Sequence, residues 1–337
     1  MGATHMTLLS RGQQPTLVLP DLTVYGRHSP RTERYYSPPS GRAVMGDLPP
    51  AEPVRLERRG PVGLLWLDEP PVNVLSARLL DRLSERLDEV ARDPALRVLV
   101  LASARERAFA AGANIREMAP MGPAEARTHG ARGQAVTVRI ERLPIPVVAA
   151  VHGTCVGGGL EIALACDLIV ASEDALFGQP EINLGVMPGW GGTRRLPRRI
   201  GAARGRWWIY SGETVGAAEA LRQGLLLQVV PRADLLPAAL AVAQTLAGKP
   251  AMALAAAKEA ILGSLDDERD RGLRHELTLW SGLFGTPDQR EGMAAFLEKR
   301  PPRFGPRPIG PRHRPRSGGH RPRRVHRPPP RGGKHKR

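Results

Sequence analysis

The segment 146–172, PVVAAVHGTCVGGGLEIALACDLIVAS, places two apolar runs on either side of a glycine-rich turn and an alanine-rich stretch. Residues 146–151 and 167–172 have the length and composition of buried strands. The stretch between them predicts a helix that begins near Gly158. A strand, a helix and a second strand at this spacing are typical of a crossover connection between parallel strands. The segment therefore predicts an α/β fold with a largely parallel sheet.

The sequence on both sides continues this alternation. Residues 62–67 and 97–103 are short apolar runs that predict further strands. Between them, Ser76 is placed to cap a helix over 77–91, which has apolar residues at helical spacing: Leu79, Leu80, Leu83, Leu87 and Val90. A second helix is expected over 123–142, ending before Pro144. After Gly201 the sequence predicts mainly helices, at 217–224, 234–247, 251–263, 267–284 and 288–299.

The positive charge of the chain is concentrated at its ends. The chain has 337 residues and a formal net charge of +16. Residues 301–337 contain thirteen Lys and Arg and no Asp or Glu, whereas residues 51–300 contain 31 basic and 30 acidic residues. The Pro-, Arg- and Gly-rich tail has little apolar surface to bury, so it is expected to be disordered. Its arginines either bind phosphates of a nucleic acid without sequence preference or form a solvated appendage.

Several classes of protein are disfavoured by the composition. No apolar run is long enough to span a membrane, and the N-terminus lacks the pattern of a secretory signal. The two cysteines, Cys155 and Cys166, lie in apolar stretches, which favours reduced core residues in a cytosolic protein. His152 has no second ligand at metal-binding spacing, so no metal site is expected.

Three consecutive glycines, Gly157, Gly158 and Gly159, lie where the central helix begins, and Glu161 follows in its first turn. Glycine lets a backbone approach a ligand closely, and the first N–H groups of a helix have no partner within it. These N–H groups and the helix dipole favour a negatively charged ligand. No phosphate-loop or dinucleotide fingerprint follows. The stretch alone is compatible with an anion site beside a carboxylate, or with a structural helix start and an exposed Glu161.

Two further stretches favour a functional site. The stretch ERAFAAGANIREM (106–118) follows a predicted strand with a turn of small residues, which can present free N–H groups at the carboxyl edge of a sheet. In FGQPEINLGVMPGWGGTRRL (177–196), Glu181 follows Pro180 within a glycine-rich loop. A second carboxylate near N–H donors indicates paired acid–base chemistry at a carbon next to a thioester.

Five motifs of the chain, in order and spacing, resemble those of the enoyl-CoA hydratase/isomerase (crotonase) family, and within it the hydratases. They are FAAGANIREM, PVVAAVHGTCVGGGLEIALACDLIVAS, FGQPEINLGVMPGWGGTRRLPR, AAKEAI and TPDQREGMAAFLEKR. The resemblance covers roughly residues 52–304, and both termini lie outside it. Agreement among several linked motifs is much more specific than a single glycine loop.

The resemblance implies a role for four residues in particular. Ala113 and Gly158 match the positions whose N–H groups form the family's oxyanion hole for the thioester carbonyl. Glu161 and Glu181 match the two catalytic glutamates of the hydratases. Glu161 would help to activate a water for attack at the β-carbon, and Glu181 would deliver a proton to the α-carbon. The implied reaction is the reversible syn addition of water to a trans-2-enoyl-CoA, which gives a 3-hydroxyacyl-CoA.

The resemblance also implies a set of residues that bind the substrate or its CoA moiety. Arg116 stands where many members have a lysine, and it either contacts the CoA phosphates or is an ordinary surface charge. Phe296 and Lys299 match positions through which a neighbouring subunit completes the CoA pocket. The full set comprises Ala111, Gly112, Asn114, Ile115, Arg116, Gly157, Gly159, Pro180, Phe296 and Lys299.

The domain organisation follows from the same resemblance. It implies a crotonase-like spiral of ββα units over residues 52–250 and a helical C-terminal trimerisation region over 251–304. A low-complexity leader, 1–51, and a disordered tail, 305–337, flank them. The implied partners are an acyl-CoA substrate and further copies of the chain, in a homotrimer or a dimer of trimers (a homohexamer). No cofactor is expected besides the CoA of the substrate. The expected setting is fatty-acid metabolism, such as β-oxidation, in the cytoplasm.

Alternatives remain open at this point. The chain is a hydratase, an isomerase or another crotonase-type acyl-CoA enzyme such as a hydrolase, or a crotonase scaffold that binds nucleic acid through residues 301–337. Isomerases commonly keep only the carboxylate that matches Glu181, so the presence of both glutamates favours a hydratase. Asn114 departs from the Asp of many hydratases. Trp190 replaces a small residue, and it either narrows the acyl pocket or packs at a loop–helix joint.

Overall fold

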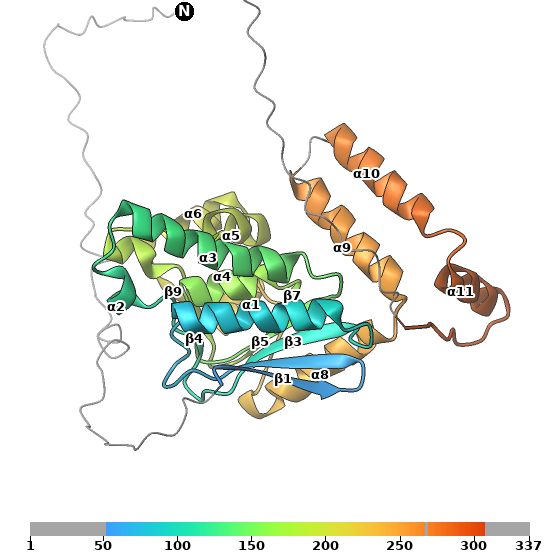
Figure 1. Ribbon diagram of the computed structural model, residues 1–337, viewed down its shortest axis with the longest axis horizontal. Coiled ribbons are helices and arrows are strands. Elements are labelled where there is room, and N and C mark those ends of the chain that lie inside the picture. Colours follow the sequence, from blue (N-terminus) through green and yellow to red (C-terminus); the bar gives the residue numbers. More distant parts are fainter. Residues whose placement is uncertain (1–51, 267–268, 307–337) are drawn as a thin grey trace, which may run out of the picture. The chain divides into compact units, whose positions relative to one another are not determined.

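The computed structural model describes residues 52–266 and 269–306 (Figure 1). The predicted leader at 1–51 and most of the tail at 305–337 lie outside the described residues, as does most of the basic segment to which nucleic-acid binding was assigned. The expectations for these segments therefore stay predictions.

A six-stranded sheet forms the centre of the described chain. Its spatial order is β1-β2-β3-β5-β7-β10, and all neighbours are parallel except β1 and β2. The predicted parallel sheet is thus confirmed, and neither of its edge strands, β1 and β10, was predicted. The strands are β1 (Val54–Arg59), β2 (Val62–Leu67), β3 (Val98–Ser103), β5 (Val147–Val151), β7 (Leu168–Ser172) and β10 (Gln228–Val230).

A second sheet of four short strands receives the chain as it leaves the first. Its order is β4-β6-β8-β9, and its strands are β4 (Ala108–Ala110), β6 (Thr154–Val156), β8 (Leu176–Gly178) and β9 (Thr214–Gly216). Strand β4 follows β3, β6 follows β5 and β8 follows β7, and each pair leads into helical segments. The chain therefore repeats a ββα unit that alternates between two sheets, which confirms the spiral implied by the family resemblance.

Helices follow the strand pairs and make up most of the C-terminal part. They are α1 (Ala77–Arg92), α2 (Ile115–Met118), α3 (Pro123–Glu141), α4 (Gly158–Ala165), α5 (Gly192–Ile200), α6 (Ala202–Ser211), α7 (Ala217–Arg222), α8 (Leu235–Ala247), α9 (Ala251–Asp266), α10 (Arg269–Gly282) and α11 (Pro287–Leu297). The sequence predicted all of these except α2, α5 and α6. In α1 the predicted cap is confirmed, since Ser76 Oγ accepts from the N–H of Leu79 at 3.2 Å. The five predicted core residues of α1 are buried.

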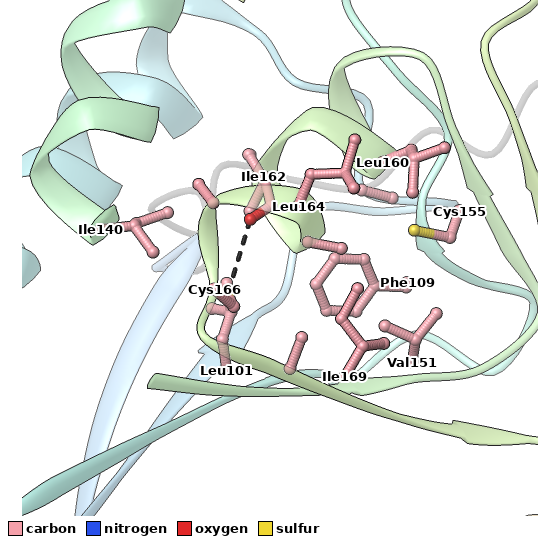
Figure 2. Close-up of a cluster of buried hydrophobic side chains, with 14 of the residues drawn as sticks. Leu101, Phe109, Ile140, Val151, Cys155, Leu160, Ile162, Leu164, Cys166 and Ile169 are labelled. Atoms are coloured by element: carbon pink, nitrogen blue, oxygen red, sulfur yellow. Dashed lines mark hydrogen bonds between the residues drawn. The ribbon is translucent and has the colours of Figure 1, made fainter. Parts of the chain in front are cut away.

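The core lies on both faces of the larger sheet, because successive side chains of a strand point to opposite faces. In β3, Leu99 and Leu101 belong to the cluster under α1, α3 and α4, whereas Val98 and Val100 belong to the cluster under α8. Figure 1 shows these helices on opposite sides of the sheet. The cluster around α4 is aliphatic apart from Phe109 and a few other rings (Figure 2).

Both cysteines lie in this core, as predicted. Cys155 and Cys166 are fully buried and unbridged, and the Sγ of Cys166 points toward the carbonyl of Ile162 (Figure 2). Burial raises the pKa of the Cys166 thiol to about 12. A thiol with such a pKa is almost entirely protonated near neutral pH, so it is a poor nucleophile.

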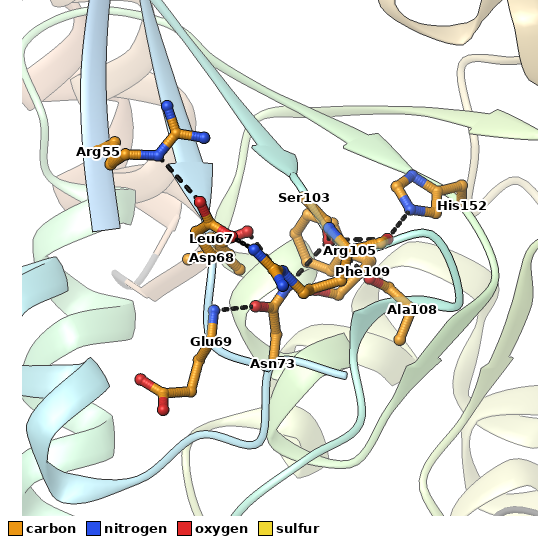
Figure 3. Close-up of polar contacts among 10 residues, drawn as sticks. All are labelled: Arg55, Leu67, Asp68, Glu69, Asn73, Ser103, Arg105, Ala108, Phe109 and His152. Atoms are coloured by element: carbon orange, nitrogen blue, oxygen red, sulfur yellow. Dashed lines mark hydrogen bonds and ion pairs between the residues drawn. The ribbon is translucent and has the colours of Figure 1, made fainter. Parts of the chain in front are cut away.

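The buried side-chain amide of Asn73 stabilises the connection between the first sheet and the second. Asn73 is fully buried and has a φ of +51°. Its Nδ2 donates to Ser103 Oγ and to the carbonyl of Phe109, both at 2.8 Å, and its Oδ1 accepts from the N–H of Glu69 at 2.8 Å (Figure 3). Asn73 thus links the ends of β2 and β3 to β4.

We predict that Asn73→Ala lowers the free energy of unfolding by about 2 kcal/mol, because buried donors and acceptors lose their partner. Urea denaturation measures this change. The exposed Asn183, with one long hydrogen bond of 3.4 Å to the carbonyl of Gly212, gives a matched control. Equal losses for Asn73→Ala and Asn183→Ala would contradict the role given to the buried amide.

A buried ion pair attaches the C-terminal helices to the core. Lys258 of α9 is 8% exposed, and its Nζ donates to Asp167 Oδ2 at 2.7 Å and to the carbonyl of Ile145 at 3.1 Å. Helices α9 and α10 pack against each other. Within the described ranges, no single helix is both long and apolar enough to cross a membrane. The segments Arg232–Ala247 and Ala251–Ser264 reach that combination only together, with a bend of 105° between them.

Candidate active site

The turn after β4 is held by hydrogen bonds to the segment between β2 and α1. The N–H of Ala111 donates to the carbonyl of Val72 at 3.1 Å, and the N–H of Leu75 donates to the carbonyl of Gly112 at 2.9 Å. Gly112 has a φ of +94°, a region that favours glycine. Within the described part of the chain, no backbone carbonyl accepts from the N–H of Ala113. The turn therefore presents a fixed donor without a partner.

The glycine triplet lies directly against this turn. Gly157 has a φ of +55°, and its N–H donates to the carbonyl of Gly178 at 3.0 Å. Gly158 is the first residue of α4, so its N–H has no acceptor within the helix. A β-carbon placed on Gly112 would lie 3.8 Å from the N of Gly158. The structure thus brings the segments of Ala113 and Gly158 together, as the sequence predicted.

Gly159 lets α4 pack closely on β4. A β-carbon at this position would lie 2.2 Å from the carbonyl oxygen of Ala110. Glycine at position 159 is therefore required by packing, because it allows the close approach of the two segments. The expected contact of Gly159 with the substrate stays a prediction.

Glu161 is buried, so the alternative of an exposed surface carboxylate is wrong. Its side chain is 2% exposed. One carboxylate oxygen, Oε1, accepts from the N–H groups of Trp190 at 2.7 Å and Gly192 at 2.8 Å. Burial raises the pKa of Glu161 above its ordinary value, while the two amides and the nearby Arg195 oppose that rise. One oxygen is fixed by the main chain, which leaves Oε2 as the oxygen for other partners.

Glu181 lies against Gly157, the first residue of the glycine triplet. It is in the short 3-10 helix Pro180–Leu184, where Pro180 is the first residue. A β-carbon placed on Gly157 would lie 3.2 Å from Glu181 Oε1, so the absence of a side chain there makes room for the carboxyl group. Burial, followed by the negative charge of Glu161, raises the pKa of Glu181 to about 8. The two carboxyl groups therefore interact, as paired acid–base chemistry requires.

Gln179 is a site residue that the sequence analysis did not single out. Its side chain is fully buried, two residues before Glu181. In the amide orientation that satisfies both groups, its Nε2 donates to Glu181 Oε1 at 3.0 Å and Oε2 at 3.1 Å. The signal available in the sequence was its place in the stretch FGQPE, directly before the proline that begins the 3-10 helix. Gln179 orients the Glu181 carboxyl group.

The other predicted binding residues divide into two groups. Asn114 caps α2, because its Oδ1 accepts from the N–H of Arg116 at 3.1 Å and its Nδ2 donates to Glu117 at 2.9 Å. Ile115 follows within α2 and is partly exposed, while Arg116 is exposed beside the oxyanion turn. Asn114, Ile115 and Arg116 therefore lie near the candidate site.

The remaining two, Phe296 and Lys299, are not joined to that site by any contact between described residues. Phe296 is 83% exposed on α11, and Lys299 follows α11 with a φ of +55°. Their assignment to the pocket of a neighbouring subunit stays a prediction.

His152 makes a contact with the main chain of the first ββα unit. The Nε2 of His152 lies 2.7 Å from the carbonyl oxygen of Arg105 (Figure 3). Among the residues that the structure describes, no three His, Cys, Asp or Glu side chains are grouped as metal ligands would be.

The arrangement as a whole supplies three chemical functions. The N–H groups of Ala113 and Gly158 lie on neighbouring segments, and among the described residues no backbone carbonyl accepts from either of them. Such donors suit an oxygen that gains negative charge. One buried glutamate is held through a single oxygen by main-chain donors. A second carries a proton near neutral pH, because its pKa is raised to about 8. Two interacting carboxyl groups are suited to acid–base chemistry at one site when their environments differ in this way.

Several known proteins resemble this chain over about three quarters of its length. The enoyl-CoA hydratase/isomerase family matches residues 57–307. A probable enoyl-CoA hydratase of Mycobacterium bovis is 41% identical over 254 residues, which are 75% of this chain and 98% of that protein. Among solved structures, an enoyl-CoA hydratase of Bacillus anthracis superposes with a TM-score of 0.72 at 36% identity. An enoyl-CoA hydratase subunit of Geobacillus kaustophilus does so with the same TM-score at 40% identity. Each of these two structures is covered to 98%, by 75% of this chain. The chain therefore belongs to the enoyl-CoA hydratase/isomerase family.

Proposed function

We propose that this protein is an enoyl-CoA hydratase that adds water reversibly to a trans-2-enoyl-CoA. The observation that carries the proposal is the pair of interacting carboxyl groups, Glu161 and Glu181, beside the glycine triplet. An enzyme that only shifts a double bond needs one proton carrier. The second carboxyl group, buried and fixed by two amides, is the feature that favours hydration.

The thioester carbonyl is placed against the N–H groups of Ala113 and Gly158. These donors withdraw electrons from the carbonyl and stabilise the enolate that forms when the β-carbon is attacked. They belong to the main chain and are fixed before substrate arrives, so no reorganisation is needed during the reaction. The loss of one such donor typically costs about 10²–10³ in rate.

The two glutamates divide the proton transfers. Glu161 is the ionised partner, and its Oε2 holds a water and takes one of its protons while the water oxygen bonds to the β-carbon. Glu181 is the protonated partner and delivers its proton to the α-carbon. The β-carbon gains a C–O bond, the α-carbon gains a C–H bond, and the double bond is lost. The proposed addition is syn, with both carboxyl groups acting on the same face of the enoyl group.

The remaining expectations belong to the same proposal. Arg116 and the adjoining turn would contact CoA, with Phe296 and Lys299 supplied by a neighbouring subunit of a trimer or a dimer of trimers. Exposed apolar side chains on α10, including Leu273 and Trp280, support an oligomer, because large apolar residues grouped on a surface mark interaction sites. The reaction uses no cofactor besides the CoA of the substrate. The proposed setting is fatty-acid metabolism, such as β-oxidation, in the cytoplasm.

The proposal is tested by following a trans-2-enoyl-CoA through loss of the conjugated absorbance. We expect hydration to a 3-hydroxyacyl-CoA, identified by mass and by chromatography. Formation of a 3-enoyl-CoA or of free CoA instead would identify an isomerase or a hydrolase and overturn the proposal.

Hydration should fall as the pH rises through about 8. Glu181 must be protonated to act as the acid, and its pKa is raised to about 8, so the active form is complete below that pH and is lost above it. The measurement is kcat/KM for hydration between pH 6 and 10, because this quantity reports the pKa values of the free enzyme. A profile without a decline on the alkaline side would contradict the assignment of Glu181 as the acid.

Stability should change with pH in the same direction. A carboxyl group with a raised pKa binds its proton more tightly in the folded chain than in the unfolded one. Its favourable contribution is complete below the ordinary pKa of 4.5, and it is lost as the pH rises through about 8. Glu181→Gln should therefore raise the melting temperature relative to wild type more at pH 9 than at pH 5. An equal difference at the two pH values would contradict the raised pKa.

A further inference from the structure

The indole of Trp190 fills the space between two helices beside the candidate oxyanion hole. Trp190 is 4% exposed. A β-carbon placed on Gly158 of α4 would lie 2.5 Å from its Cζ3, and one placed on Gly133 of α3 would lie 2.1 Å from its Cε2. Both distances are far shorter than any real carbon–carbon contact. The ring therefore occupies a slot that exists because both flanking residues are glycines.

The main chain of Trp190 is fixed on both sides. Its N–H donates to Glu161 Oε1 at 2.7 Å. Its carbonyl accepts from Thr137 Oγ1 and from Arg195 Nη1, both at 2.9 Å. Arg195 is held in turn by Glu141, at 2.8 Å between Nη2 and Oε2. The indole cannot leave its slot by a movement of the loop without releasing the carboxylate of Glu161.

A second space lies beyond the indole. The rings of Trp190 and His129 have their centroids 5.6 Å apart. His129 lines a pocket of about 240 Å³ together with Ala77, Met121, Thr128 and the charged residues Glu117, Glu125 and Arg132. The Nε2 of His129 is buried and has no hydrogen-bond partner among the described residues. The indole thus contacts both Gly158, where the thioester would bind, and His129, which lines the pocket that a longer acyl chain would enter.

We propose that Trp190 sets the acyl-chain length, so that the enzyme acts on short trans-2-enoyl-CoA thioesters, on the order of four to six carbons. The inference rests on the proposed hydratase function. The thioester carbonyl must reach the N–H of Gly158, and the indole is in contact with that same residue. An alkyl chain that continues past the β-carbon toward His129 meets the ring. Carbons that a pocket cannot accept are rejected by a factor of about ten or more for each methylene in favourable cases.

The test is the ratio of kcat/KM for octenoyl-CoA to that for crotonyl-CoA, in wild type and in Trp190→Ala. The main-chain amide that holds Glu161 remains in the variant. We expect the wild-type ratio to be about 0.1 or lower, and we expect it to rise at least about tenfold in Trp190→Ala. Trp190→Phe leaves a smaller cavity than Trp190→Ala and should raise the ratio by a smaller factor. It replaces the alanine variant in the test if that variant does not fold.

Trp208→Ala is the matched control, because it removes an equally buried indole from α6, outside the slot. It should leave the ratio unchanged. A wild type that hydrates octenoyl-CoA as well as crotonyl-CoA overturns this inference alone. So does an unchanged ratio in the folded variants at position 190. A wild type that hydrates neither thioester overturns the proposed function as well.

Discussion

Glutamine at position 161 or at position 181 will lower kcat for hydration by about 10²-fold or more. Glutamine is close to glutamate in shape, but it neither accepts a proton at neutral pH nor delivers one. Glu161→Gln removes the proposed base for the water, and Glu181→Gln removes the proposed acid, whose pKa is raised to about 8. The double variant should be little slower than the slower single variant, because groups that act as a unit are strongly non-additive. The measurement is single-turnover hydration of crotonyl-CoA.

Glu213→Gln is the control, because this glutamate is exposed next to the small sheet. It should retain the wild-type rate. A Glu161→Gln variant that keeps its rate while Glu181→Gln loses it would contradict a hydratase and indicate an isomerase. A loss in neither variant would exclude both glutamates as catalytic residues.

The second large effect is a loss of stability, expected when Gly159 is replaced by alanine. Gly159→Ala should lower the free energy of unfolding by about 3 kcal/mol, because its β-carbon would meet the main-chain carbonyl of Ala110 at 2.2 Å. A flexible side chain could move aside, but a strand within a sheet cannot. The start of α4 must shift, and with it the N–H of Gly158, so hydration should fall as well. Urea denaturation and kcat measure the two effects.

Gly130→Ala is the matched control within α3. A β-carbon there would meet nothing within 4 Å, and alanine is preferred over glycine in a helix by about 1 kcal/mol. This variant should be as stable as wild type or more so, with unchanged activity. Equal destabilisation by the two substitutions would show that close packing of α4 on β4 is not what glycine provides at position 159.

The larger sheet and most helices were predictable because their signals are local. The strands β3, β5 and β7 are runs of apolar residues, and α1 combines a serine cap with five apolar residues at helical spacing. Strand β1 has the sequence VRLERR, and its charged residues give no apolar run from which an edge strand could be predicted. Helix α5 contains four arginines and a proline, and its stability comes from partners distant in sequence, such as Glu141.

The second sheet was not predictable from propensity. Its strands have three residues each, which is too short for periodicity to appear, and they pair only because longer elements bring them together. The resemblance to a family supplied the ββα spiral that the local pattern could not.

The site was predictable in part. The oxyanion turn, the glycine triplet and both glutamates were found as motifs, and the structure places them together. Gln179 was missed because a neutral amide leaves no charge pattern. The amides that hold Glu161 were missed because a main-chain N–H of Trp190 or Gly192 is not visible as a residue type. The slot between Gly133 and Gly158 depends on two helices whose packing no local window contains.

The three successive ββα units each contribute one part of this site. These parts are therefore synthesised one after another. The first unit carries Ala113, the second carries Gly158 and Glu161, and the third carries Glu181. The amide of Gly192 that holds Glu161 lies 31 residues after it in the chain. On the ribosome, the glutamate therefore emerges well before the group that fixes it. A nascent protein acquires its catalytic geometry only when the third unit has left the exit tunnel and folded onto the first two.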